Sequence, residues 1–584
     1  MTLAYSERPS SARGLTFQQH WPNFPTGWAR WIGGLLLASV VLRFVALGAV
    51  PLVPEEAYYW MYAQHPSLSY FDHPPMVAWV IGAGTAIFGD TEFGVRIVGC
   101  LLMLAATAMM YGFARAWHGR AAATIAAALM LVLPLYFGAG FIATMDSPLL
   151  FFWMAALVGV TAALRHGKPW GWYLAGVGLG GAMLSKYTGV FIAAGTGLCV
   201  LAHHPWRRRW LASPHPYLGL LLGFALFTPV IIWNAQHDWA SFRFQFVDRF
   251  EGKTFELRYV LKFLGYQLLA ATPMLLLGFA AVVRRAVGSR RRLVRPRTVV
   301  ALAFSLPLLA VMAYKSLRYD IHINWTLPAF LTLLPAFARW FLVRLRTHTS
   351  DLARRHWWRQ LTWTAAICLS VNVGLLIYLL LLQPHLRVLS AFGPWDELAV
   401  AIERHEDALE RATRTEPLVV VDGPYRLPSI VAFYRTPHER DADAARWTTS
   451  EWILGGRGLA YAYWSDPSDW VGRDCIYVFE NDHKDRLRRL RGRFDSVEVV
   501  DEVDLRSTTG SKSGGRYGIA ICKGLRVKSL SGEAEPRVSH AKGAAVPAAA
   551  TAGAANTAQA GATVPRAVPD AGAAASVQEV PITE

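Results

Sequence analysis

Charged residues are scarce in this chain of 584 residues. Asp, Glu, Lys and Arg together make up 17% of the sequence, and hydrophobic residues make up 53%. Soluble domains carry about a quarter charged residues, so a wholly soluble protein is excluded. The shortage falls on residues 31–383, which consist mostly of long apolar runs, whereas residues 384–584 have the composition of a soluble protein.

Acidic residues are outnumbered by basic ones, which leaves a formal net charge of +17. Such an excess can indicate nucleic-acid binding. Here, however, Lys and Arg cluster in short loops between apolar runs, which is the positive-inside pattern of membrane proteins. We therefore expect a lipid bilayer, and no nucleic acid, as the partner of this charge.

Cysteine is also rare, and no two cysteines have the CxxC spacing of a metal or redox site. Three lie in apolar runs, where a thiol packs as a small apolar side chain. Cys475 and Cys522 lie in predicted strands of the soluble part and could form a disulfide if that part faces an oxidising compartment. A cleavable signal sequence is lacking too, and the first apolar run, Trp31–Val50, predicts an uncleaved anchor.

Eleven apolar runs are candidates for membrane-spanning helices, because a span needs about 20 largely apolar residues. They cover residues 31–50, 94–113, 121–140, 147–164, 171–185, 187–203, 216–234, 259–282, 298–314, 325–343 and 361–383. The sequence thus predicts an α-helical polytopic membrane protein with about 11 transmembrane helices in residues 31–383.

The distribution of basic residues predicts how these helices cross the bilayer. If residues 1–30 are cytoplasmic, every basic cluster falls in a cytoplasmic loop. The clusters lie in residues 115–120, 165–168, 207–209, 284–297 and 344–359. The odd number of spans then places the C-terminal part on the periplasmic face. Five loops share that face: residues 51–93, 141–147, 185–186, 235–258 and 315–324.

The soluble part is expected to form a small periplasmic α/β domain over residues 384–525. Its strands are predicted at "PLVVVDGPY", "CIYVFEND" and "GRYGIAICKG", and its helices at residues 396–413, 427–435 and 484–492. The spacing shows no nucleotide-binding fingerprint. Residues 526–584 are rich in Ala, Gly, Pro, Thr and Val without periodicity, which predicts a disordered tail.

Paired acids open the first periplasmic loop. Glu55 and Glu56 directly follow the first span, and one of them could be a general base that takes a proton from an acceptor hydroxyl. The alternative is a solvated pair, or an acid stabilised by the dipole of the helix that begins at "AYYWMYA". Tyr58 and Tyr59 suit the membrane interface and contact with a sugar or acceptor.

Further acids follow. Asp72 and His73 precede two prolines and the short apolar stretch Met76–Phe88, which predicts an interfacial helix. They could bind a metal or a phosphate, unless Asp72 is only a turn residue. Asp146 in the second loop either caps the next helix or places a carboxylate beside the Glu55 loop.

Isolated cations lie on the same side. Lys186 is in the third loop, and Lys315 and Arg318 are in the fifth. The two cations of the fifth loop run against the positive-inside trend, so an anionic partner is expected for them. Lys186 either contacts a phosphate or snorkels to the interface.

The fourth loop opens with polar and aromatic residues suited to sugar contact, including Trp233 and Asn234. His237 in this loop and His322 in the fifth are candidate metal ligands together with Asp72. The five loops therefore bring acids, cations and aromatics to one leaflet. A lipid-linked phosphosugar needs such a site, with cations for the phosphate, a base for the acceptor and aromatics for the sugar.

The sequence resembles the polyprenyl-phosphate-dependent glycosyltransferases of the membrane-embedded type C fold. The nearest group is glycosyltransferase family 39 with its bacterial relatives, which include protein O-mannosyltransferases and the enzymes that add aminoarabinose or galacturonic acid to lipid A. The matching stretches are "EEAYYWMYAQHPSLSYFDHPPMVAW", "FGVRI", "TMDSPLLFFW", "LSKYTGVFI", "IWNAQHDWASFRFQF" and "YKSLRYDIHINWTLPAF". They cover most of residues 50–330 and do not reach the C-terminal domain.

The resemblance implies transfer of a sugar from undecaprenyl phosphate, with inversion, to lipid A, another envelope glycan or a protein hydroxyl. The reaction would take place on the periplasmic face of the bacterial inner membrane. The family pattern implies three catalytic acids: Glu55, Glu56 and Asp146. The carrier leaves as an anion, so positive charge is needed at its phosphate, and the candidates are His73, Lys186, Lys315 and Arg318. A divalent metal could share this task through Asp72 with His322 or His237.

Two positions depart from the family pattern. Glu55 stands where the family has Asp, which leaves open whether Glu55 or Glu56 is the base. His73 stands where the aminoarabinose transferase has Lys, and His is mostly neutral at pH 7.

A secondary transporter or flippase for a lipid-linked or small-molecule substrate is the main alternative. Transporters often show internal repeats and polar residues at the membrane midplane. This sequence has no repeat at half its length, and its polar residues lie at one face, which favours the enzyme. A lipid-glycan ligase or polymerase would share the chemistry but not the "EEAYYW…DHPP" loop.

Overall fold

The structure is a computed structural model. It describes residues 37, 40–248, 254–289, 295–347, 350–383, 390–436, 444–480, 487, 490–505 and 515–526. The predicted cytoplasmic segment 1–30 lies outside the described residues, as does nearly all of the predicted tail 526–584. Five of the nine residues of the predicted helix 484–492 also lie outside them.

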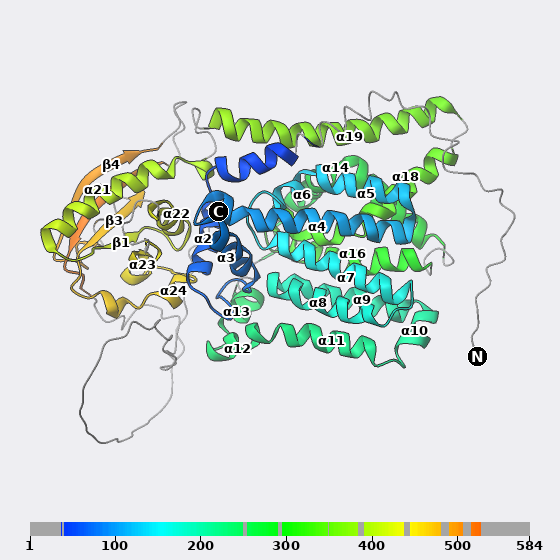
Figure 1. The fold of residues 1–584 in the computed structure, drawn as a ribbon, viewed down its shortest axis with the longest axis horizontal. Helices are drawn as coiled ribbons and strands as arrows, with labels where there is room; N and C mark the ends of the chain where they lie inside the picture. The colour runs from blue at the N-terminus through cyan, green and yellow to red at the C-terminus, as the bar shows by residue number, and fades with distance from the viewer. Residues whose placement is uncertain are drawn as a thin grey trace, which may run out of the picture. The chain divides into compact units, whose positions relative to one another are not determined.

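A bundle of α-helices makes up the first part of the chain (Figure 1). It starts with the helix Val40–Ala49. The helices that follow are α2 Pro54–Gln64, α3 Met76–Phe88, α4 Glu92–His118, α5 Arg120–Val132, α6 Pro134–Ala139, α7 Asp146–Leu164, α8 Trp170–Ser185, α9 Phe191–Ala202, α10 His204–Trp210, α11 His215–Leu226, α12 Thr228–Gln236, α13 Ala240–Arg243, α14 Leu257–Val287, α16 Pro296–Lys315, α17 Leu327–Phe330, α18 Leu333–Thr347 and α19 Asp351–Ile377.

Five helices among the described residues are long and apolar enough to cross a membrane, and up to seven spans result if each of two bent pairs counts as one. The five are α4, α7, α14, α16 and α19 with its continuation to Leu382. The bent pairs are α11 with α12, and residues 323–330 with α18. The chain is therefore a helical membrane protein.

The predicted number of about 11 is larger because it included short and broken apolar runs. The described part of each predicted run is largely helical, but several runs form helices of 10–17 residues, such as α5 and the segment Tyr187–Ala202. The run 121–140 divides where Pro134, which has no backbone N–H, ends α5 and begins α6. The predicted interfacial helix is α3, with the expected bounds Met76–Phe88.

Glycines allow the central helices to pack closely. A Cβ atom at Gly159 of α7 would lie 2.5 Å from the backbone nitrogen of Ala175 in α8, and one at Gly176 would lie 2.1 Å from the carbonyl oxygen of Gly219 in α11. Small residues at such crossings are typical of helix pairs in membranes. The glycines of these apolar runs thus serve helix packing.

The two ends of the bundle differ in kind. At one end lie the loops predicted to be periplasmic, which we call the acidic-loop end. The predicted cytoplasmic loops lie at the other, which we call the basic-loop end. There Arg209 donates a hydrogen bond to the carbonyl oxygen of Gly167 at 3.0 Å, and Arg165 lies over the ring of Trp117.

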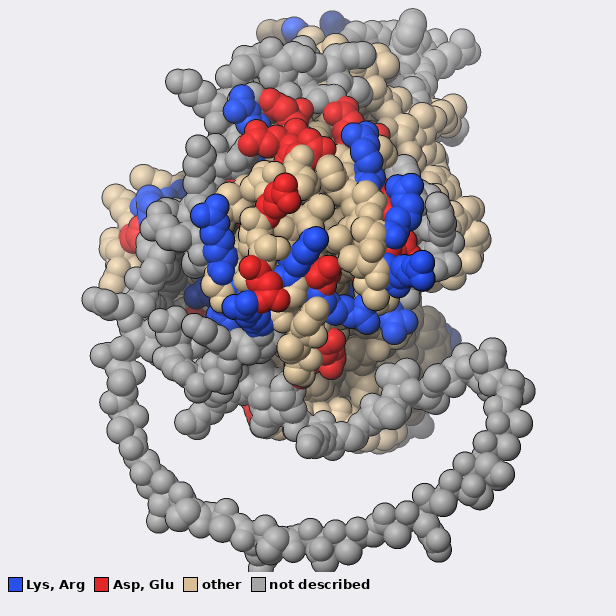
Figure 2. Space-filling view, turned by 90° about the vertical axis from the view of Figure 1, so that its left-hand side faces the viewer, with Lys and Arg blue, Asp and Glu red and all other residues tan. Residues whose placement is uncertain are grey.

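The C-terminal part contains a five-stranded sheet. Its strands are β1 Leu418–Val421, β2 Thr448–Ser450, β3 Cys475–Glu480, β4 Ser496–Asp504 and β5 Arg516–Lys523, in the order β2-β1-β3-β5-β4. The strands β1, β2 and β3 are parallel, and β5 is antiparallel to β3 and β4. The helices α21 Trp395–Thr413 and α22 Arg426–Arg435 accompany it. Acidic and basic side chains mix on the surface of this end (Figure 2), as on water-exposed domains.

Three strands and two helices of this sheet domain lie where the sequence predicts them. The sequence prediction missed β2, which has only three residues, and β4, whose burial does not follow a clean alternation. Cys475 and Cys522 are register partners on β3 and β5, yet both thiols are free and buried. The disulfide considered from the sequence is therefore not formed.

The helix α22 packs against α2 of the first loop. The hydroxyl of Tyr434 accepts a hydrogen bond from the backbone N–H of Leu52 at 2.8 Å and donates one to Glu92 at 3.0 Å. The ring of Phe433 meets that of Trp60 edge-on at 5.1 Å between centroids. The C-terminal domain therefore borders the candidate site.

Candidate active site

Glu56 lies in a buried ion pair with Arg96 of α4. The two side chains are joined by two hydrogen bonds of 2.7 and 2.6 Å, and both are fully buried. Glu56 also accepts the backbone N–H groups of Val53 and Ala143, at 3.0 and 2.8 Å. Arg96 donates its other hydrogens to the carbonyl oxygens of residues 47, 50 and 51. This arrangement ties together the first two loops and the end of the first span.

Glu55 has different surroundings, although it precedes Glu56 in the same turn of α2. Its carboxylate pairs with Arg426 of α22, and its side chain is 33% exposed. Pro54 begins the helix, and both acids lie in its first turn, where the helix dipole favours negative charge. Because the partner of Glu55 comes from the C-terminal domain, a movement of that domain would release the carboxylate.

Asp146 joins three loops. Its Oδ1 accepts from the Nζ of Lys186 at 2.9 Å, and its Oδ2 accepts from the side-chain amide of Asn324 at 2.5 Å. Asp146 is 4% exposed, and the ammonium of Lys186 also lies 6.0 Å from the ring centre of Trp325. Both carboxylate oxygens are used in this way, so Asp146 does not act as the helix cap that was one alternative from the sequence.

Asp72 lies at the centre of a group of tyrosines. It accepts hydrogen bonds from the hydroxyls of Tyr58, at 3.1 Å, and Tyr62, and its backbone carbonyl accepts from Gln245 at 2.5 Å. The Nε2 of His73 lies 4.0 Å from its Oδ2. Burial, and then the charge of Asp72, hold the pKa of Tyr58 and Tyr62 well above the usual value. Both hydroxyls therefore remain neutral donors.

Tyr59 is close enough to several acidic residues for their charges to affect its hydroxyl. Burial raises its pKa well above the usual value, and the charges of Asp72, Tyr425, Glu55 and Asp146 add to that effect. Its ring also lies 5.7 Å from that of His73. Carboxylates from the first and second loops therefore act on one tyrosine.

The short helix α24, Tyr461–Trp464, carries aromatic rings from the C-terminal domain to this site. The ring of Tyr463 lies 5.5 Å from Trp233 and 5.6 Å from His237, and the ring of Trp464 stacks on His65 at 4.5 Å. The backbone N–H of Ala460 donates to the hydroxyl of Tyr58 at 3.2 Å. Burial raises the pKa of Tyr463 to about 12.

Four other residues predicted for the site belong to the fourth and fifth loops. Asn234 is buried and bonds within its own segment, to the carbonyl of Val230 and the N–H of Phe242. Lys315 ends α16 and is half-buried, while Arg318 and His322 are exposed.

The predicted metal ligands do not form one set. Asp72, His237 and His322 are all described, but the described residues contain no group of three or more His, Cys, Asp or Glu that could hold a metal ion. His237 instead stacks on Trp233 at 4.1 Å and has its Nδ1 2.7 Å from the carbonyl oxygen of that residue. The residues present therefore do not fit a metal held by protein ligands alone.

Sequence reasoning missed four residues of the site: Arg96, Asn324, Arg426 and Tyr463. A lone arginine within an apolar run was the available signal for Arg96, because a charge there needs a partner. Asn324 lies in a loop that the sequence did single out. No local pattern marks Arg426 or Tyr463, which reach the site only through the packing of the C-terminal domain.

Part of the chain that forms this site matches known proteins. The family model "Dolichyl-phosphate-mannose-protein mannosyltransferase" matches residues 72–233, a segment that contains Asp72, Asp146 and Lys186. The lipid A galacturonosyltransferase RgtD of Rhizobium johnstonii is 25% identical over 302 residues, which are 51% of this chain and 62% of that protein. The undecaprenyl phosphate-alpha-4-amino-4-deoxy-L-arabinose arabinosyl transferase 1 of Pseudomonas fluorescens is 30% identical over 213 residues, 33% of this chain and 37% of that one.

Among solved structures, apo ArnT from Cupriavidus metallidurans superposes with a TM-score of 0.56 at 17% identity, covering 85% of this chain and 98% of that one. The chain has the type C glycosyltransferase fold. The resemblance given by the sequence is thereby confirmed. The structural match covers the helical bundle and also part of the C-terminal region. In sequence, the chain matches no more than about three fifths of the length of the two curated relatives.

Proposed function

We propose that this protein transfers a sugar from undecaprenyl phosphate to an acceptor hydroxyl, with inversion at the anomeric carbon. The observation that carries the proposal is the meeting of Asp146, Lys186 and Asn324 beside the loop of Glu55 and Asp72. A cation and several carboxylates at the end of a membrane bundle suit a substrate with a phosphate and a lipid tail. Both relatives described above are named as transferases that modify lipid A or use undecaprenyl phosphate.

We assign the general base to Glu55. In the reaction the acceptor oxygen bonds to the anomeric carbon, the bond from that carbon to the phosphate oxygen breaks, and the acceptor proton passes to the base. Glu56 has little capacity for this proton, because Arg96 and two backbone N–H groups already occupy its oxygens. Glu55 has one cationic partner and is partly exposed. Glu56 would then position α2 rather than react.

Lys186 is assigned to the departing phosphate. The bond cleavage leaves a phosphate with added negative charge, and a cation held nearby lowers the energy of that state. Asp146 and Asn324 would fix the Lys186 side chain in place. His73, Lys315 and Arg318 would add positive charge as the donor binds.

The proposal also includes a divalent metal ion that would bind together with the donor phosphate. Magnesium often binds through one protein carboxylate together with phosphate oxygens of the substrate, and Asp72 would be that carboxylate. The steps assigned above to Glu55 and Lys186 do not depend on it.

The reaction is proposed for the periplasmic face of the bacterial inner membrane. Lipid A or another envelope glycan is the first choice of acceptor, and a protein hydroxyl is the second. Mass spectrometry of lipid A, exopolysaccharide and secreted proteins from a deletion strain would identify which of them loses a sugar.

Purified protein in proteoliposomes with a polyprenyl-phosphate sugar tests the activity. The wild type should cleave the donor, and Glu55→Gln should not. The proposal is supported if the variant nevertheless keeps the thermal unfolding temperature of the wild type. Movement of the intact lipid-linked sugar across the bilayer without cleavage would show the flippase or transporter instead.

A further inference from the structure

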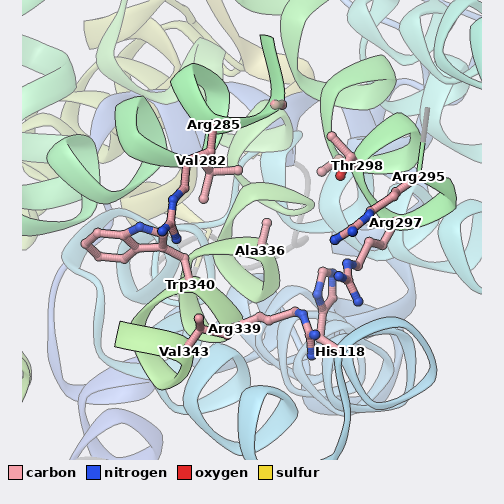
Figure 3. Close-up of a pocket in the computed structure, with 12 residues that line it drawn as sticks. His118, Val282, Arg285, Arg295, Arg297, Thr298, Ala336, Arg339, Trp340 and Val343 are labelled. Atoms are coloured by element: carbon pink, nitrogen blue, oxygen red, sulfur yellow. The ribbon is translucent and has the colours of Figure 1, made fainter. Parts of the chain in front are cut away.

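A cavity of about 370 Å³ lies at the basic-loop end, between the ends of α4, α14, α16 and α18 (Figure 3). Four arginines line it, from three of these helices and the residue before α16: Arg285, Arg295, Arg297 and Arg339. Arg285 and Arg295 are exposed, whereas Arg297 and Arg339 are half-buried. The described residues that line the cavity include no acidic residue.

The positive charge of the cavity is uncompensated among the described residues. None of the four arginines forms an ion pair there with a described acid, and Arg295 and Arg339 both repel Arg297. Four like charges around one space raise the free energy of the protein unless an anion offsets them. Arginine is also the side chain best shaped to bind phosphate through two parallel hydrogen bonds.

Two residues that line the cavity carry buried polar atoms that no described residue satisfies. The Nδ1 of His118, the last residue of α4, is buried and forms no hydrogen bond with a described residue. The same is true of the indole Nε1 of Trp340 in α18. His118 projects toward the cavity between Arg297 and Arg339 (Figure 3). Buried polar atoms are rarely left unpaired, so these atoms are suited to hydrogen-bond a ligand in the cavity.

This cavity is separate from the candidate active site. The helix α4 carries Arg96 near its first turn and His118 at its end, and at 1.5 Å per residue these are about 33 Å apart along the helix. Similarly, α16 begins at the cavity and ends at Lys315. The donor and acceptor of the proposed transfer therefore do not occupy it.

We propose that this cavity is a binding site for a phosphate-bearing anion. Its position at the end of membrane helices suits the headgroup of an acidic phospholipid, since basic pockets between transmembrane helices bind such headgroups. A soluble phosphate or diphosphate has the same chemistry and could reach the exposed arginines. The start of α16 lies at the cavity, and the positive end of its dipole adds to the attraction.

Inorganic phosphate and diphosphate are the first probes, added to the full-length protein in an uncharged detergent. Binding raises the thermal unfolding temperature of the wild type. In Arg339→Gln this gain is lost, and the dissociation constant rises about tenfold or more, because a charge-assisted hydrogen bond is removed. Without anion, Arg339→Gln is as stable as the wild type or more so, because repulsion with Arg297 is relieved.

Arg208→Gln is the matched control. Arg208 is an exposed arginine of α10 at the same basic-loop end, outside the cavity. This variant is expected to keep the phosphate-dependent gain. If Arg208→Gln and Arg339→Gln weaken binding equally, or if the wild type gains nothing from phosphate, diphosphate or phospholipid, the cavity is not a built site and the proposal is overturned.

Native mass spectrometry from nanodiscs distinguishes the two sources of phosphate. Nanodiscs of phosphatidylcholine with cardiolipin should leave bound cardiolipin on the wild type but not on Arg297→Gln/Arg339→Gln. If the wild type retains cardiolipin and added diphosphate displaces it, the lipid headgroup is the occupant of the cavity. Binding of diphosphate without retained cardiolipin identifies a soluble ligand, and supports the same site.

Discussion

Glu55 and Glu56 are adjacent in α2, but their partners give them different roles. Glu56 is enclosed with Arg96, and both of its oxygens are bonded. Glu55 meets Arg426 at a partly exposed position. A buried charge is stable only with its partner, whereas a partly exposed carboxylate can exchange a partner for a substrate.

Substitution of the two glutamates should therefore affect different quantities. Glu56→Gln leaves the Arg96 charge uncompensated and should lower the free energy of unfolding by about 3–5 kcal/mol. Glu55→Gln should leave stability close to that of the wild type and remove donor turnover. Thermal unfolding in detergent and a turnover assay on the same preparations check this. A Glu56→Gln protein with wild-type stability would contradict the structural role.

Lys186 provides the second test at this scale. Lys186→Met should lower kcat about 10²–10³-fold, which is the usual effect of removing one group that stabilises developing negative charge. Lys168→Met is the control, because Lys168 is exposed in a loop of the basic-loop end. The measurement is the steady-state rate with saturating donor. Equal rates for the wild type and Lys186→Met would refute the assignment to the phosphate.

The short helix α24 has only four residues, yet it contributes several aromatic contacts to the candidate site. It brings Tyr463 against Trp233 and His237, which belong to the helix α12 and the residue after it. The ring of Tyr463 also stacks on Phe71 at 5.5 Å. An element of the sheet domain therefore forms part of the aromatic surround of the site in the bundle.

Removal of the Tyr463 ring should weaken substrate binding. Each aromatic contact contributes about 0.5–1.5 kcal/mol beyond its buried area, so Tyr463→Ala should raise KM by about tenfold with a smaller change in kcat. Tyr463→Phe keeps the ring and should behave as the wild type. The prediction fails if Tyr463→Phe loses as much as Tyr463→Ala, since the hydroxyl and not the ring would then be responsible.

At the scale of the whole molecule, the bundle separates two kinds of polar surface. Hydrogen bonds connect all five predicted periplasmic loops at the acidic-loop end: Glu56 to Ala143, Asp72 to Gln245, and Asp146 to both Lys186 and Asn324. The basic loops lie at the far ends of the same helices. This separation is the basis for the proposed orientation in the membrane.

Labelling of single cysteines tests that orientation. All five natural cysteines are buried, so their background reaction with a membrane-impermeant thiol reagent should be low. Leu68→Cys at the acidic-loop end should react from the periplasm in intact cells, and Arg208→Cys should react only after the membrane is opened. Both positions are exposed. Reaction of both from the same side would contradict the orientation and the periplasmic site with it.

Much of the fold could be predicted because it depends on local patterns. The apolar runs correspond to helices, three short apolar segments of the C-terminal part to the strands β1, β3 and β5, and the polar loops to the acidic-loop end. Fewer of the described helices are long enough to count as spans than the number of predicted apolar runs, because length and apolarity do not show where Pro134 breaks a helix or where two helices bend against each other. The described residues likewise do not join Asp72, His237 and His322 into one metal group.

The sequence by itself determined that this is a helical membrane protein and which loops carry the acids and cations, while the type C fold was implied by the resemblance of its motifs to a known family. Hydrophobicity and charge act on each segment separately, so they can be read along the chain. Only the tertiary structure decided that Glu56 is closed off by Arg96, 40 residues away, and that Glu55 meets Arg426, 371 residues away. Such pairings depend on distances between segments in space, which no local pattern encodes.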